Sequence, residues 1–246
     1  MNRQFVNFQN VGIAVVMGLA LLIVACGRQV TPNPPGLGPG GAAPGYFSVF
    51  FDTQAPFNFS NYQYMIVFNT SGSGQTPSTD TIQTNWAGWS YALVALGSGI
   101  GARAEFVQFV RSNQNPHVPP YWYTPQTNPQ QLSFNLNQNG TGTEFSIIAK
   151  KAIFSATPGP SPTPTPSNVW TFNAFVTQPS QGNLTFVDSM GAGGPIDPQW
   201  NSPTLCMTEP FDTTYYALKT YGIPDPASQI VSIEIANNPA VVKACP

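Results

Sequence analysis

Charged side chains are scarce in this 246-residue chain, where Asp, Glu, Lys and Arg make up 7% of the residues. An average soluble domain has about 25%. No basic run is present that could neutralise phosphates, so the sequence predicts no nucleic-acid partner. Polarity comes instead from Asn, Gln, Ser and Thr, which favour turns, strands and exposed loops over helix interiors.

Histidine, the usual proton shuttle and metal ligand, occurs once, as His117 between prolines. Zinc-type His and Cys spacing, a G-x-S-x-G nucleophile motif and a phosphate-binding loop with lysine are all absent. We therefore predict no catalytic residues, no metal and no cofactor. A hydrolase is the least favoured alternative, because it needs two carboxylates facing each other at a set distance.

A short apolar run follows a basic start at the N-terminus. Arg3 is the only charge before Val11–Ala25, which holds no charge. As a helix this run would span roughly 22 Å, against the ~30 Å core of a bilayer. A secretory signal therefore explains residues 1–25 better than a stable transmembrane helix does.

The end of the run, Ile23-Val24-Ala25-Cys26, resembles a bacterial lipobox. The resemblance covers the first 27 residues. It implies that Cys26 is acylated and that the chain is cut before it. It also implies a lipid anchor in the membrane, on the extracytoplasmic side of the cell envelope, and in the outer membrane if the bacterium has two membranes. Residues 26–45 are rich in Gly and Pro and are expected to form a tether.

Two cysteines remain after Cys26, and both lie near the C-terminus: Cys206 and Cys245. An even pair in an exported protein predicts a disulfide, although two free thiols are the alternative. The bond would close a loop of about 40 residues and contribute roughly 3–4 kcal/mol.

The dominant pattern in residues 46–246 is alternation of apolar and polar side chains with a period of two. It predicts a mainly β fold, an antiparallel β-sandwich of roughly 9–11 strands. Two segments, Tyr46–Phe51 and Tyr62–Phe68, are apolar on both faces and are expected to be buried strands. Further strands are expected at Thr81–Trp86, Ser90–Leu96, Arg103–Arg111, Leu132–Asn137, Glu144–Ile148, Trp170–Thr177, Leu184–Val187 and Ile230–Ile235.

One short helix is expected near the C-terminus. Asp212 can cap it, Thr213–Tyr221 can form two turns, and Gly222 followed by Pro224 can end it.

The proline-rich segment 157–168, TPGPSPTPTPSN, is expected to form an extended loop. We favour one sandwich over 46–246 with this loop projecting between two strands. The alternative is a linker between Tyr46–Ala156 and Val169–Pro246. The second piece would then have a poor core.

The chain faintly resembles carbohydrate-binding sandwiches of the family-9 and DOMON-like type. The resemblance rests on the order of early strands ending at Asp52 and on the later run EFSIIAKKAIF…VWTFNAFVT. The resemblance implies the fold and carries no binding residue.

Aromatic residues are abundant, at 13% of the chain. Trp86, Trp89 and Trp170 are expected to pack in the core or against loops. Tyr121-Trp122-Tyr123 lies between prolines, in a loop or edge strand, and could stack against sugar rings. We therefore predict a non-catalytic module whose partner is a polysaccharide. A structural or protein-contact role in the envelope is the alternative.

Overall fold

The computed structural model describes residues 41–79, 88–97, 101–110, 121–123, 130–136, 141–155, 166–180, 183–192, 200–218, 222 and 225–245. The sequence predictions at Cys26, Thr81–Trp86 and His117 lie outside these residues.

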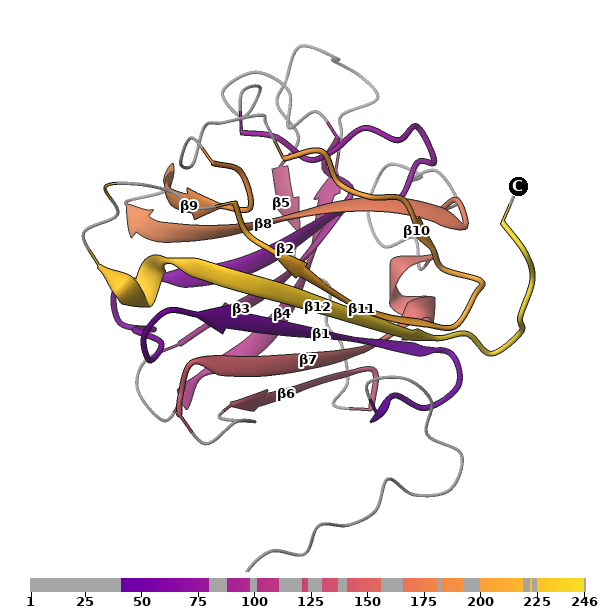
Figure 1. Ribbon diagram of the computed structural model, residues 1–246, viewed down its shortest axis with the longest axis horizontal. Coiled ribbons are helices and arrows are strands. Elements are labelled where there is room, and N and C mark those ends of the chain that lie inside the picture. The colour runs from indigo at the N-terminus through magenta and orange to yellow at the C-terminus, as the bar shows by residue number, and fades with distance from the viewer. Residues whose placement is uncertain are drawn as a thin grey trace, which may run out of the picture. The chain divides into compact units, whose positions relative to one another are not determined.

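The described residues form two antiparallel sheets (Figure 1). The five-stranded sheet has the order β11-β12-β1-β7-β6, with β1 (Tyr46–Thr53), β6 (Leu132–Leu136), β7 (Glu144–Lys150), β11 (Phe211–Tyr216) and β12 (Ile230–Asn238). The seven-stranded sheet has the order β10-β8-β2-β3-β4-β5, and β9 also pairs with β8. Its strands are β2 (Gln63–Asn69), β3 (Tyr91–Leu96), β4 (Arg103–Val110), β5 (Tyr121–Tyr123), β8 (Val169–Ser180), β9 (Asn183–Ser189) and β10 (Leu205–Cys206). The prediction of a mainly β, antiparallel fold is confirmed, and the described strands slightly exceed the expected number.

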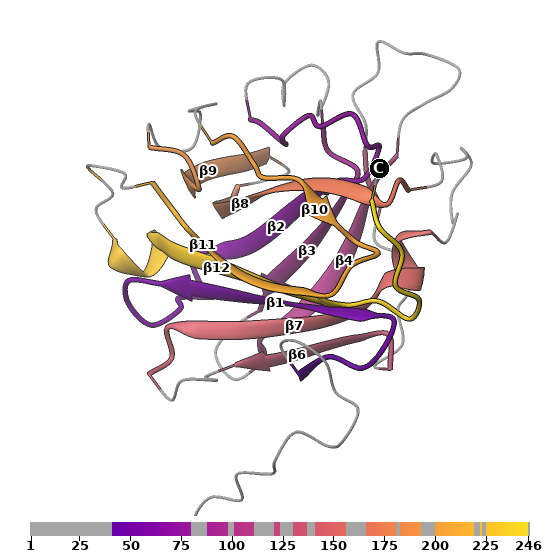
Figure 2. The ribbon, with the colours of Figure 1, turned by 45° about the vertical axis from the view of Figure 1, so that its right-hand side comes forward.

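The two sheets share one hydrophobic core. Phe47, Val49 and Phe51 alternate along β1, are fully buried, and belong to the same cluster as Ile66 and Phe68 of β2. The rings of Phe47 and Phe68 meet edge to face at 5.7 Å between centroids and so connect one sheet to the other. Figure 2 shows β12, β1 and β7 of one sheet beside β2, β3 and β4 of the other. This arrangement is consistent with the predicted sandwich.

β2 is buried on both of its faces, as its apolar sequence predicts. It lies between β8 and β3. Met65 and Val67 belong to a second cluster, separate from the shared core, in which Trp89 stacks on Phe175 at 5.1 Å. Trp89 and Trp170 are each 3% exposed, so both indoles pack inside the protein as expected.

The predicted helix at Thr213–Tyr221 is wrong in its described part. Phe211–Tyr216 forms β11, which pairs with β12 along its whole length. Its Thr and Tyr side chains favour a pleated strand, and the ladder with β12 outweighs the capping signal of Asp212. No α-helix occurs among the described residues, where a short 3-10 turn at Pro226–Ser228 is the helical element nearest the C-terminus. No described helix is long and apolar enough to cross a membrane.

Strands from both sides of the proline-rich segment take part in both sheets. β8, which follows the segment, pairs with β2, and β12 pairs with β1. Residues 157–165 of the segment lie outside the described part of the chain.

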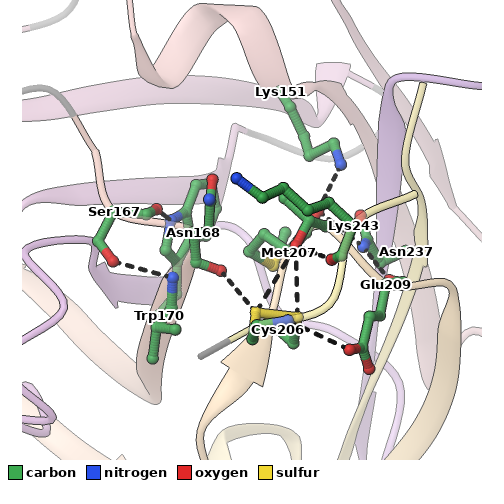
Figure 3. Close-up of a disulfide and its surroundings, with 12 residues drawn as sticks. Lys151, Ser167, Asn168, Trp170, Cys206, Met207, Glu209, Asn237 and Lys243 are labelled. Atoms are coloured by element: carbon green, nitrogen blue, oxygen red, sulfur yellow. Dashed lines mark hydrogen bonds between the residues drawn. A yellow bond between two sulfur atoms is a disulfide. The ribbon is translucent and has the colours of Figure 1, made fainter. Parts of the chain in front are cut away.

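The predicted disulfide between Cys206 and Cys245 is confirmed (Figure 3). Hydrogen bonds add to this attachment of the C-terminal segment, since Lys243 N–H donates to the Thr208 carbonyl at 3.0 Å and Cys245 N–H to Glu209 Oε1 at 3.3 Å.

Nearby, Lys151 Nζ donates to the Met207 carbonyl at 2.7 Å. Burial lowers the pKa of this amine to about 8.

Candidate functional site

Two hollows flank Ser60 in the connection between β1 and β2. The larger encloses about 460 Å³ and the smaller about 260 Å³. The described lining of the larger, which we call the polar hollow, is Ser60, Asn61, Gln178, Pro179 and Thr185. The described lining of the smaller, which we call the apolar hollow, is Pro56, Phe57, Asn58, Phe59, Ser60, Leu136 and Gly142.

Strand register brings the walls of the polar hollow together. Gln63, at the start of β2, pairs with Thr177 of β8, so the chain just before β2 meets the chain just after Thr177. Across the β8–β9 hairpin, Gln178 pairs with Thr185. Asn61 and Gln178 therefore reach one site, although more than a hundred positions separate them in the sequence.

The connection between β1 and β2, which contributes residues to both hollows, is held by hydrogen bonds centred on Asn58. Its backbone N–H donates to Tyr64 Oη at 3.0 Å, and its backbone carbonyl accepts from Tyr62 N–H at 2.9 Å. Its side-chain Oδ1 accepts from Asn61 N–H at 3.3 Å. A site fixed before binding loses less conformational entropy when a ligand arrives.

Aromatic packing also supports the loop. The Phe57 ring meets the Tyr64 ring edge to face at 4.8 Å and stacks against Phe59 at 5.5 Å. Phe59 is 8% exposed. The apolar hollow therefore has a well-packed, partly aromatic lining and lies beside the polar hollow.

Tyr62, which follows Asn61 of the polar hollow in the chain, is 6% exposed. Its pKa is raised by burial first, and then by the neighbouring Asp225 carboxylate. The side chains of Ser228 and Gln178 lower the pKa. The phenol therefore stays neutral at physiological pH.

The described lining of the two hollows contains no ionisable side chain. The polar hollow offers amides and hydroxyls, which pair with hydroxyl-bearing ligands, and the apolar hollow offers rings and aliphatic surface. Apolar walls with a few polar groups are typical of small-molecule binding sites. Together the hollows are complementary to a neutral molecule that has both hydroxyl groups and an apolar face.

A group of carboxylates lies on the outer face of the five-stranded sheet. Asp52 of β1 pairs directly with Glu144 of β7. Burial raises the pKa of both, and the charge of Asp52 raises that of Glu144 further. Neither residue lines a hollow, and no group of three or more His, Cys, Asp or Glu among the described residues is placed to hold a metal ion.

The predicted platform Tyr121–Tyr123 forms β5, which pairs with Gln108–Val110 of β4. Gln108 of β4 pairs with Tyr91 of β3, and Tyr91 pairs with Phe68 of β2. Phe68 lies near the end of β2, whereas Gln63 is its first residue. The backbone of β5 and the polar hollow are therefore at opposite ends of the seven-stranded sheet. The side chains of β5 lie outside the described part of the structure.

Sequence reasoning missed Ser60, Asn61, Gln178 and Thr185. Each is an ordinary exposed polar residue, and the only available signal was the general richness in amides and hydroxyls.

Comparison with known proteins finds no relative of this chain. No protein-family model, no curated protein and no solved structure matches this chain. The class that the described residues define is therefore a structural one: a mainly β protein with two antiparallel sheets and a disulfide at its C-terminus.

Proposed function

We propose that the protein is a non-catalytic module that binds uncharged glycans in the two hollows beside Ser60. The observation that carries the proposal is the pairing of an amide-and-hydroxyl surface with an aromatic and aliphatic one. A pyranose ring has hydroxyl groups around its edge and C–H groups on its faces, so it matches both surfaces at once. Aromatic side chains supply the apolar contact and amides the hydrogen bonds.

Lack of charge in the lining supports a neutral ligand. An anionic sugar would need a cationic partner, because an unpaired charge loses solvation when it binds. The described lining offers no Lys, Arg or His. Neutral oligosaccharides are therefore expected to bind more tightly than uronate or sulfated ones.

An anchored, extracytoplasmic position forms the second part of the proposal. Acylation of Cys26 would hold the domain at the bacterial envelope through the tether 26–45, in the outer membrane where there are two. The Cys206–Cys245 disulfide supports an oxidising compartment. A glycan-binding domain on such a tether would attach the bacterial envelope to polysaccharide outside the cytoplasm.

An array of neutral and anionic oligosaccharides tests the binding claim with three forms of the full chain: wild type, Gln178→Ala and Asn201→Ala. Gln178 lines the polar hollow, whereas Asn201 is an exposed amide next to Ser202, whose Oγ accepts from Phe172 N–H near the other end of β8. We expect neutral glycans to bind wild type and Asn201→Ala alike, and Gln178→Ala about tenfold more weakly. No binding by folded wild-type protein overturns the proposal.

A further inference from the structure

β11 (Phe211–Tyr216) leaves one edge of the five-stranded sheet without a neighbouring strand. It pairs with β12 on one side and is the last strand of the sheet on the other (Figure 1). Asp212, Thr214 and Tyr216 are exposed on one face of the strand, and Thr213 is exposed on the other. The middle of β11 is therefore open to solvent on both faces.

The free backbone groups at this edge belong to Asp212, Thr214 and Tyr216. In an antiparallel ladder, opposite residues alternate between pairs that exchange hydrogen bonds and pairs that do not. Ala217 N–H donates to the Val231 carbonyl at 3.0 Å, so the odd-numbered residues of β11 form the bonds to β12. The N–H and C=O groups of the three even-numbered residues point away from β12, and no strand among the described residues pairs with them.

The edge lacks the features that usually keep edge strands from pairing. β11 contains no Pro or Lys, and its register with β12 has no shift. The open stretch ends at Leu218, whose N–H donates to the Met190 carbonyl at 2.9 Å. At the other edge of the sheet, Leu132 of β6 is 9% exposed, and Phe134 and Leu136 are half-buried. β11 is therefore the more accessible edge.

The sequence of β11 is complementary to itself in one antiparallel register. With a two-fold axis at Thr214, Asp212 of one copy lies opposite Tyr216 of the other, and all three outward-pointing residues of each strand exchange hydrogen bonds. Registers centred on Asp212 or on Tyr216 pair fewer of these residues. A register centred on Asp212 also places two carboxylates directly opposite each other, which is unfavourable. Hydrogen bonding and charge therefore favour the same register.

We infer that the protein forms a homodimer in which the β11 strands of two copies pair antiparallel about Thr214 and join their five-stranded sheets. The same surface serves on both copies, as in most homo-oligomers. The contacts are mainly between backbones, so the dimer is expected to be weak, with a dissociation constant on the order of 100 μM or tighter. This inference goes beyond the proposed function, and its test needs no glycan.

Sedimentation of the full chain over a range of concentrations, in density-matched detergent, measures the dissociation constant. Thr214→Lys places two like charges on the axis and should raise the constant at least about tenfold. Within one copy the new lysine lies opposite Glu234, so the fold should be preserved. The control Thr214→Ser keeps the backbone and an uncharged side chain, and its constant should stay within about twofold of wild type.

Two sedimentation results would overturn the inference. One is a wild type that remains a monomer at about 1 mM, far above the expected constant. The other is a folded Thr214→Lys variant that dimerises as tightly as wild type.

Cysteine cross-linking tests the register. Opposite Cα atoms in a hydrogen-bonded antiparallel pair lie about 5.5 Å apart, within the range that a disulfide spans. Under mild oxidation of the full chain, Thr214→Cys should therefore form covalent dimers much faster than Ser133→Cys, an exposed position on β6 at the opposite edge of the sheet. Equal rates in the two variants overturn the inference.

Discussion

The phenol oxygen of Tyr64 donates a hydrogen bond of 2.9 Å to the backbone carbonyl of Ala227, 163 positions later in the chain. The same oxygen accepts from Asn58 N–H at 3.0 Å. One fully buried side chain thus ties the β1–β2 connection, at Asn58 of the apolar hollow, to the 3-10 turn that Asp225 caps.

Tyr64→Phe should therefore destabilise the fold as well as the site. The change keeps the ring but leaves a carbonyl and an N–H without their partner, which costs about 1–3 kcal/mol of unfolding free energy. Urea unfolding measures it. Tyr216→Phe, at a position 70% exposed, is the matched control, and its unfolding free energy should stay within about 0.5 kcal/mol of wild type. Equal stability of the two variants would contradict the role given to Tyr64.

Removal of the disulfide should lower stability more strongly. Cys206 and Cys245 are separated by 39 positions, and in the chain-entropy model a loop of this size contributes roughly 3–4 kcal/mol. We expect the variant with both cysteines changed to serine to unfold at lower guanidinium concentration than wild type. A reducing agent should shift the wild-type curve toward that of the variant and leave the variant unchanged. Coincident curves for oxidised and reduced wild type would show that the bond contributes nothing.

The paired carboxylates on the five-stranded sheet should make the fold more stable in mild acid. Burial raises the folded-state pKa of Asp52 and Glu144 above the ordinary 3.8 and 4.5. The folded state then binds protons more tightly than the unfolded state, so this contribution to stability grows as pH falls through the raised values and levels off below the ordinary ones.

Glu144→Gln tests that relationship, because it removes one charge of the pair. At neutral pH the variant should be more stable than wild type, and its stability should change less as the pH falls toward 4.5. Thermal unfolding across this pH range measures both effects. A variant that is less stable than wild type at neutral pH would show that the Glu144 carboxylate is favourable where it lies.

Acylation of Cys26 predicts a simple change in location. Cys26→Ser removes the sulfur that the lipobox resemblance marks for modification, so the variant should lose its fatty chains and leave the membrane fraction. Mass spectrometry of the N-terminal peptide and fractionation of cells measure the two consequences. An unacylated wild-type protein that still begins at Met1 in the cell would contradict the anchoring proposal.

Most strands were predictable because they depend on local alternation, whereas β10 and β11 were not expected. Arg103–Arg111 was expected and Arg103–Val110 is observed; Ser90–Leu96 was expected and Tyr91–Leu96 is observed. The failure at Thr213–Tyr221 has a physical cause: Asp212 and Gly222 look like helix ends, but a neighbouring strand supplied a longer hydrogen-bond ladder than two helical turns could.

The candidate site was not predictable from local pattern. Asn61 and Gln178 meet only because β2 and β8 pair in one particular register, and nothing near either residue in the sequence records that pairing. The aromatic run Tyr121–Tyr123 drew attention because it is conspicuous, whereas recognition at the hollows depends on scattered amides and hydroxyls.

Mapping of glycan-induced NMR chemical-shift changes tests the central claim most directly, since it reports where on the folded chain the ligand lies. With the tightest-binding neutral oligosaccharide, we predict that the largest changes fall on Ser60, Asn61 and Gln178, and that Gln178→Ala needs about tenfold more glycan to reach the same changes on Ser60 and Asn61. Changes that centre on Tyr121–Tyr123, at the other end of the sheet, or no changes at saturating glycan, would contradict the account.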